Sequence, residues 1–222
     1  MIVDERFVTY INSLGQENAP LLSKIEAEAL RARVPVIRRE TQGLLKFLLA
    51  MSRPRRILEV GTAVGFSALL MEYYNPAECQ IDTIENYEKR IPIARQNFMC
   101  AGKENVIKLL EGDAAQVMKT LREPYDFIFM DAAKGQYLHF LPEVMRLLRE
   151  GGLLVSDNVL QDGTVIESRF AVCRRDRTIH KRMRGYLYEL THHERLVTSI
   201  LPVGDGVTVS VKQGLQEHGG SR

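Results

Sequence analysis

The feature that most constrains the fold of this chain is a series of short apolar segments that alternate with amphipathic, helix-like stretches. Five of these segments are expected to be β-strands: RILEV (56–60), CQIDTIE (79–85), VIKLL (106–110), YDFIFM (125–130) and LLVSD (153–157). Short apolar strands that alternate with helices predict a mostly parallel sheet with helices on both faces. The predicted fold class is therefore α/β.

Helices are expected between these strands and ahead of the first one. Two are predicted within about residues 4–33 and a third over 40–51, so that residues 1–52 form N-terminal helices covering the site. The helices between strands are predicted over 66–74, 88–102, 113–121 and 135–150, the last closed by Gly151 and Gly152.

The C-terminal part departs from this alternation. The apolar runs 195–203 and 207–213 flank the tight turn Gly204-Asp205-Gly206, which predicts an antiparallel hairpin. A chain of 222 residues fits one domain, here 1–222, in which residues 213–222 are a polar tail.

Composition excludes several classes of protein. A net charge of +2 and 45% hydrophobic residues are ordinary for a soluble domain. The three cysteines lie far apart without a CxxC pair, so we expect reduced thiols and a cytoplasmic location. The N-terminus carries acidic residues, and no segment has the roughly 20 apolar residues of a membrane span. Neither a signal peptide nor a membrane association is expected.

Polar residues follow the predicted strands, where ligands bind in open parallel sheets. After the first strand, EVGTAVGFS contains Gly61 and Gly65, and glycine allows the backbone to turn sharply against a ligand. The dinucleotide fingerprint GxGxxG has a further glycine where this chain has Ala63. An ordinary turn between a strand and a helix explains this motif about equally well.

The second and third strands strengthen the prediction of a nucleoside site. Glu85 ends the second strand about twenty residues after Gly65, where an acid accepts the ribose hydroxyls of an adenosine. Both NAD and S-adenosylmethionine carry that ribose. Asp113 and Ala114 follow the third strand and would flank an adenine, although Asp113 also suits a helix N-cap.

Oxygen-bearing side chains also end the fourth and fifth strands. Asp131 follows one, and Asp157 with Asn158 ends the other. If these strands are neighbours, the three side chains converge as hard ligands for Mg²⁺, Mn²⁺ or Ca²⁺, not for zinc. A nearby cation would lower the pKa of Lys134 from about 10.4 and let it act as a base. Alternatively, Lys134 only neutralises Asp131.

A basic segment follows the fifth strand. Arg174, Arg177, Lys181 and Arg184 lie roughly opposite an apolar helical face made of Ile179, Met183, Tyr186, Leu187 and Leu190. Clustered cations attract a phosphate backbone, although a solvated helix face is the simpler interpretation. The histidines His139, His180, His192 and His193 have no metal-ligand spacing and are expected at the surface or at helix ends.

The motifs EVGTAVGFS, IDTIE, GDA, FMDAAKGQY and SDNVL, in this order, resemble metal-dependent class I S-adenosylmethionine O-methyltransferases of the catechol and caffeoyl-CoA type. The resemblance runs from about residue 34 to the hairpin. It implies a Rossmann-like methyltransferase sheet, a homodimer, Lys134 as catalytic base beside Asp131, and Mg²⁺ (or Mn²⁺) on Asp131, Asp157 and Asn158. It implies that S-adenosylmethionine contacts Ile37, Glu59, Gly61, Ser67, Glu85, Asp113, Ala114 and Asp131.

The segments RTIHKRMRGYLYELTHH and TSILPVGDGVTVSVK further resemble a bacterial branch, the tRNA 5-hydroxyuridine methyltransferases. This implies methylation of a wobble uridine in the tRNA anticodon loop to 5-methoxyuridine, with the four cations of the basic segment on phosphates. Two other functions stay open. One is O-methylation of small catechols or phenols, and the other is a cofactor-binding protein that only docks tRNA.

Overall fold

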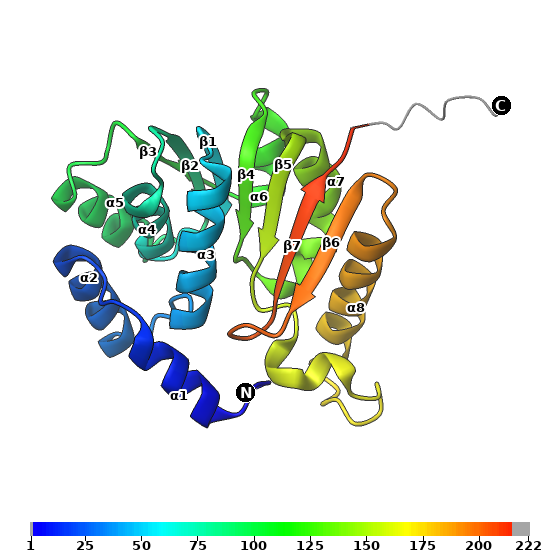
Figure 1. Cartoon of the computed structure of the whole chain (residues 1–222). Coiled ribbons are helices and arrows are strands. Elements are labelled where there is room, and N and C mark those ends of the chain that lie inside the picture. Colours follow the sequence, from blue (N-terminus) through cyan, green and yellow to red (C-terminus); the bar gives the residue numbers. More distant parts are fainter. Residues whose placement is uncertain (1, 215–222) are drawn as a thin grey trace.

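The computed structural model describes residues 2–214, and its strands form one mixed sheet (Figure 1). The strand order is β3-β2-β1-β4-β5-β7-β6. The strands are β1 (Arg56–Val60), β2 (Gln80–Glu85), β3 (Ile107–Glu111), β4 (Tyr125–Met130), β5 (Leu148–Ser156), β6 (Leu196–Leu201) and β7 (Val207–Lys212). Strands β1 to β5 are parallel, and β7 runs antiparallel to both β5 and β6. The predicted fold class, including the C-terminal hairpin, is confirmed.

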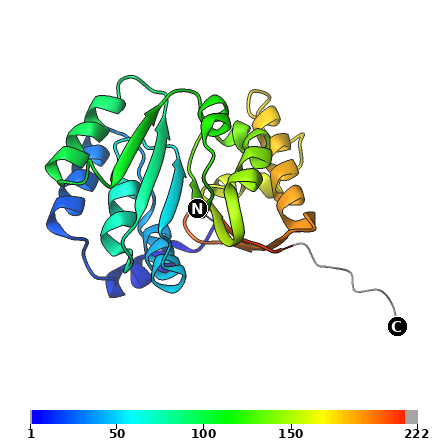
Figure 2. The same ribbon diagram turned by 90° about the horizontal axis from the view of Figure 1, so that it is seen from above.

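Helices lie on both faces of this sheet (Figures 1 and 2). One group comprises α1 (Glu5–Leu14), α2 (Pro20–Arg31), α3 (Arg39–Ser52), α4 (Phe66–Tyr74) and α5 (Ile91–Cys100). The other comprises α6 (Ala114–Thr120), α7 (Tyr137–Leu147) and α8 (Arg177–His192), together with the short 3₁₀ helices η1 (Lys134–Gln136) and η2 (Gln161–Ile166). In Figure 2, α8 (orange) and α2 (blue) lie on opposite sides of the molecule.

Two hydrophobic cores result from the alternation of side chains along each strand. In β4, Phe127 and Phe129 belong to the core beneath α2–α5, whereas Ile128 and Met130 belong to the core beneath α6–α8. All four side chains are fully buried. This burial on both faces explains why β4 reads as a continuous apolar run in the sequence.

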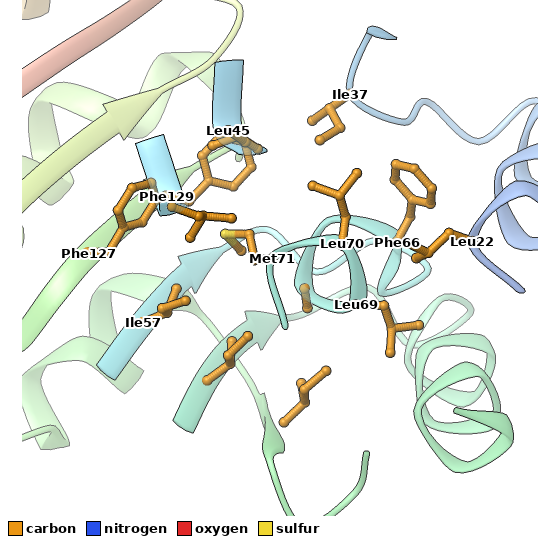
Figure 3. Packing of buried hydrophobic residues seen from close by; sticks show 14 of the residues in the cluster. Leu22, Ile37, Leu45, Ile57, Phe66, Leu69, Leu70, Met71, Phe127 and Phe129 are labelled. Atoms are coloured by element: carbon orange, nitrogen blue, oxygen red, sulfur yellow. The ribbon is translucent and has the colours of Figure 1, made fainter. Parts of the chain in front are cut away.

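Helix α4 is the most enclosed helix of the first group. Its residues Phe66–Met71 are all buried, because α2 and α3 pack over its outer side. Figure 3 shows Leu22 of α2 near Phe66, and Ile37 above the same cluster. The N-terminal helices therefore lie mainly on a sheet face, and the segment after α2 brings Pro35–Arg38 to the ends of the strands.

Several element boundaries shift by a few residues from their predictions, and the shift between α7 and β5 changes the type of element. The helix expected over 135–150 ends at Leu147, and Leu148 instead opens β5 by pairing with Tyr125. The buried ammonium of Lys212 donates to the carbonyls of Met145 and Leu148, at 2.6 Å and 2.5 Å, and so satisfies acceptors at this helix end. The pairing of Leu148 with β4 and the Lys212 side chain of β7 thus end the helix before its glycines.

The environment of α8 corrects one further prediction. His180, expected at a surface or a helix end, is buried, and its Nε2 lies 3.2 Å from the carbonyl oxygen of Glu167. It is one of the buried residues of α8, with Met183, Tyr186 and Leu190, whereas Ile179 is 38% exposed. The polar tail predicted for 213–222 falls largely outside the described residues. Within residues 2–214, no helix has both the length and the apolarity to cross a membrane.

Candidate active site

A cavity of about 730 Å³ lies beyond the carboxyl ends of the parallel strands. It brings together most of the site residues predicted from the sequence: Ile37, Gly61, Glu85, Asp113, Ala114, Asp131, Lys134, Asp157 and Asn158. Glu59 and Ser67 do not line it. The structure therefore unites the nucleoside side and the carboxylate side of the prediction in one continuous cavity.

The loop after β1 requires glycine. Gly61 has a φ of +109°, and a Cβ there would collide with the backbone carbonyl of Asp131. Gly65, with a φ of +82°, faces the ring of Phe98 in the same way. Both Gly61 and Thr62 donate their amide N–H to Ile84 O at 3.1 Å, which fixes the loop to β2. The glycines thus let the backbone pass close to the next loop and leave open space for a ligand.

Glu85 is held rigidly at the end of β2. Its Oε2 accepts the amide N–H of Ala63 at 2.8 Å, and its Oε1 accepts those of Asn86 and Tyr87, each at 2.9 Å. A carboxylate has about four acceptor sites, so one remains for an outside donor. Three backbone donors thus hold this carboxylate in place, and its contact with a ribose stays a prediction.

Asp113 is both a helix N-cap and a residue that lines the cavity, as the two interpretations of the sequence require. It is the N-cap of α6, where its Oδ1 accepts the amide N–H of Gln116 at 3.2 Å, and it also lines the cavity. Its capping bond fixes its side chain beside Ala114. The two interpretations of this residue are therefore compatible.

Glu59 and Ser67 lie beneath the glycine loop. Burial raises the pKa of Glu59 to about 8, against the opposing hydrogen bonds from Ser67 and Thr83. Thr83 donates to Glu59 Oε2 at 2.5 Å, and Oε1 has no partner among the described residues. The pair supports the loop from below, and direct contact with a cofactor stays a prediction.

Asp131 and Asp157 are neighbours because β4 and β5 pair in parallel with Met130 opposite Ser156. The ladder continues past the strand ends, since the Asp157 amide donates to Met130 O at 2.9 Å. Asn158 follows with a φ of +58°, and its amide donates to Asp157 Oδ1 at 2.7 Å. Left-handed backbone is uncommon outside glycine and often marks functional sites.

The carboxyl groups of Asp131 and Asp157 are buried close together, which makes it unfavourable for both to be ionised. Burial raises the pKa of Asp131 to about 6, with Lys134 and Arg90 opposing that rise. Burial and the charge of Asp131 raise the pKa of Asp157 to about 7. A divalent cation would relieve this repulsion, and the three oxygen donors suit Mg²⁺ or Mn²⁺. No three His, Cys, Asp or Glu side chains in residues 2–214 form a metal cluster, so the set depends on the Asn158 amide.

Lys134 begins η1 and reaches toward a carboxylate absent from the prediction. Its Nζ lies 3.4 Å from Oδ2 of Asp205, which is buried in the β6–β7 turn and also accepts the amide N–H of Asp162. The sequence indicates only a hairpin turn for Gly204-Asp205-Gly206. Because β7 is antiparallel to β5, the start of β7 lies beside the end of β5. That placement puts Asp205 in the site.

Two further residues support the site without a sequence signal. Arg38 lines the cavity and donates to Asp162 Oδ1 at 3.0 Å, which ties the segment after α2 to η2. The buried hydroxyl of Tyr137 lies 3.2 Å from Met130 O and 3.1 Å from Asp157 O. It braces the ends of β4 and β5 just below the carboxylates.

The four cations of the basic segment divide into two pairs. Arg177 donates to Val172 O at 3.2 Å and Arg184 to Val165 O at 3.4 Å, so Arg177 also holds the loop before α8 and Arg184 also holds η2. Arg174 and Lys181 are exposed. None of the four has a carboxylate within 4.0 Å in the part of the chain described. Helix α8 packs directly against η1, which begins with Lys134.

Comparison with known proteins identifies the family. The model of the O-methyltransferase family matches residues 15–213. The chain is 32% identical over 164 residues to a catechol O-methyltransferase of Niastella koreensis, which covers 71% of this chain and 74% of that protein. It is 31% identical over 179 residues to caffeoyl-CoA O-methyltransferase 2 of Populus trichocarpa, covering 74% and 70%.

Solved structures agree with this assignment. A Staphylococcus aureus structure assigned to the caffeoyl-CoA O-methyltransferases superposes with a TM-score of 0.84 at 30% identity, covering 93% of this chain and 98% of that one. An S-adenosylhomocysteine-bound methyltransferase of Podospora anserina gives a TM-score of 0.84 at 27% identity, covering 95% of each chain. The chain therefore belongs to the O-methyltransferase family and is an S-adenosylmethionine-dependent enzyme that methylates an oxygen atom.

Proposed function

We propose that this enzyme, with Mg²⁺ or Mn²⁺, methylates the 5-hydroxyl group of a wobble 5-hydroxyuridine in tRNA. The observation that carries the proposal is the position of α8. Its cations lack carboxylate partners among the described residues, and the helix packs on the 3₁₀ turn that begins with Lys134. A polyanionic acceptor would meet these cations as its reacting base enters the cavity. An unpaired anticodon base is accessible in this way, since it can be splayed out of its stack.

The chain's own residues account for the remaining chemistry. When bound, S-adenosylmethionine supplies an electrophilic methyl group, and a divalent cation on Asp131, Asp157 and Asn158 would acidify the acceptor hydroxyl. Lys134 accepts the hydroxyl proton, and Asp205 at 3.4 Å stabilises the ammonium that results. The glycine loop after β1 and the carboxylate of Glu85 orient the cofactor. Catalysis then depends mainly on positioning within the cavity.

A second candidate function is methylation of a small catechol or phenol. It is favoured by the relatives themselves, which are named for catechol and caffeoyl-CoA. A catechol and the enol of 5-hydroxyuridine present similar oxygens, so the same carboxylates and Lys134 serve either acceptor. The two functions differ in what lies outside the cavity, where only tRNA would contact the cations of α8.

Salt dependence separates the two functions. The exposed pair Arg174→Ala with Lys181→Ala removes two candidate phosphate-binding cations while leaving Arg177 and Arg184 to hold the loop before α8 and η2. If both cations bind phosphates, the slope of log affinity for tRNA against log salt should flatten by about 0.7–0.9 for each cation removed. The measurement is kcat/KM for tRNA and for free 5-hydroxyuridine at two salt concentrations.

A matched control is Lys108→Ala with Lys119→Ala, which removes the same charge on β3 and α6, away from α8. The control should leave the preference for tRNA unchanged. An equal response of tRNA and nucleoside in both double variants would favour the phenol methyltransferase. In cells lacking the gene, mass spectrometry of tRNA nucleosides should show 5-hydroxyuridine in place of 5-methoxyuridine.

Cofactor affinity tests the nucleoside side of the cavity. Loss of a charged hydrogen bond costs about 1.5–3 kcal/mol, so Glu85→Ala should weaken S-adenosylmethionine binding by roughly tenfold or more. The variant also releases three backbone N–H donors, and Glu85→Gln is the milder partner experiment. Glu111→Ala, at the end of the neighbouring strand and outside the cavity, is the control. Unchanged calorimetric affinity in Glu85→Ala would place the ribose elsewhere.

The homodimer implied by the resemblance and the cytoplasmic location expected from the cysteines stay predictions. Sedimentation of the purified chain tests the first, and cell fractionation tests the second.

A further inference from the structure

A second, smaller depression of about 380 Å³ lies beside the active-site cavity. It is lined by Gly135, Gln136, Leu138, His139 and Arg182, and we call it the η1 pocket. Gln136 lines both the η1 pocket and the active-site cavity. The two hollows therefore adjoin, and the function proposed above makes no use of the smaller one.

A hydrogen bond places the exposed guanidinium of Arg182 at this pocket. Its Nη1 donates to the carbonyl of Gly135 at 3.1 Å, directly after Lys134 in the chain. A Cβ on Gly135 would lie 3.7 Å from Arg182 Nη1 and 3.7 Å from Ile179 Cγ1, so α8 approaches η1 closely here. A guanidinium has five N–H donors, and the bond to Gly135 uses only one of them.

The charge of Arg182 has no counterion among the described residues. Glu143 of α7 pairs with Arg146, Asp176 at the N-cap of α8 pairs with Arg175, and Glu189 of α8 makes no ion pair with Arg182. His139 adds an exposed imidazole on the other wall of the pocket. An uncompensated guanidinium with free donors is suited to bidentate recognition of a phosphate.

We propose that the η1 pocket binds the 5′-phosphate of the acceptor nucleotide itself, with Arg182 as the main donor and His139 beside it. The inference rests on the proposed function. In the common anti conformation, the 5-oxygen of a pyrimidine nucleotide points to the same side as its own 5′-phosphate. With the oxygen at Lys134, the phosphate then lies just beyond the three residues of η1. Binding of this phosphate would favour a nucleotide acceptor over a catechol, which has no phosphate.

The experiment compares 5-hydroxyuridine with its 5′-monophosphate as acceptors of the complete enzyme, with S-adenosylmethionine and Mg²⁺ present. Charge-assisted hydrogen bonds predict that wild type prefers the monophosphate by roughly 10- to 100-fold in kcat/KM. In Arg182→Ala this ratio should fall toward one. Arg182→Gln, which keeps a donor for the Gly135 carbonyl but removes the charge, should lower the ratio similarly.

Arg175→Ala is the matched control, because Arg175 is exposed on the same segment and pairs with Asp176. Its ratio should equal that of wild type. A purely structural role of Arg182 in holding Gly135 would lower turnover of both acceptors equally and leave the ratio intact, which would overturn the inference. Equal use of both acceptors by wild type would overturn it too, with the proposed function still standing. Turnover of a catechol but of neither uridine would overturn the proposed function and this inference together.

Discussion

Asp157→Ala should abolish methyl transfer while leaving the fold intact. Asp157 is one of only two carboxylates at the predicted cation site, and it is almost fully buried beside Asp131. Its removal takes away half of the negative charge available to a divalent ion. We expect kcat to fall by roughly three orders of magnitude or more, which corresponds to about 4 kcal/mol of transition-state stabilisation. Steady-state kinetics at saturating cofactor measures this loss.

The controls for this experiment use binding and stability. Measured without a divalent cation, cofactor affinity should change little, because Asp157 follows β5 whereas Glu85 ends β2 on the other side of the cavity. Asp157→Asn should be equally inactive yet melt at a higher temperature in EDTA above about pH 7. The raised pKa of Asp157, about 7, means that its buried carboxyl group is charged there and destabilises the cation-free fold. A chain of this size gains about 2–4 °C for each 1 kcal/mol. EDTA should abolish methyl transfer by the wild-type enzyme, and added Mg²⁺ should restore it. Full activity in excess chelator would contradict the predicted site.

Lys134→Met should lower kcat by roughly 10²- to 10⁴-fold, the usual contribution of a general base. Methionine keeps the length and apolar stem of the side chain but cannot accept a proton. The loss should shrink for acceptors with a more acidic hydroxyl group, because they need the base less. Asp205→Asn should show a smaller loss of the same kind, since Asp205 acts on Lys134 through their 3.4 Å contact. Rates for a series of acceptors of graded acidity provide the measurement.

The control for Lys134 is Lys108→Met, the same substitution at an exposed position of β3. Cofactor and Mg²⁺ affinity should match wild type in both variants. If Lys134→Met retained wild-type kcat for weakly acidic acceptors, Lys134 would only balance the charge of its neighbours.

The succession of strands and the polar residues at their ends can be predicted from the sequence because both depend on local patterns. Phe127–Met130 is a buried run that stops abruptly at Asp131, and Glu85 ends its strand in the same way. Parallel strands then bring these ends to one edge without further information.

What the sequence does not reveal depends on contacts between distant segments. The local pattern places Leu148 in a helix, because its pairing with Tyr125 is not visible locally. It places His180 at a surface because a helical pattern counts only apolar residues, although a buried imidazole finds its partner in the carbonyl of Glu167. Asp205 reaches Lys134 only once β7 inserts between β5 and β6, and that order has no sequence signature.

The absence of a Cβ at Gly61 has a consequence for ligand binding on the nucleoside side and the carboxylate side of the cavity. The backbone of the glycine loop passes so close to the carbonyl of Asp131 that even a Cβ would not fit between them, so we expect a shift of one loop to displace the other. A ligand that orders one loop lowers the conformational entropy that the second ligand must remove. Such coupling is reciprocal by thermodynamic linkage. Cofactor and cation are therefore expected to favour each other's binding by the same factor, although they need not touch the same atoms.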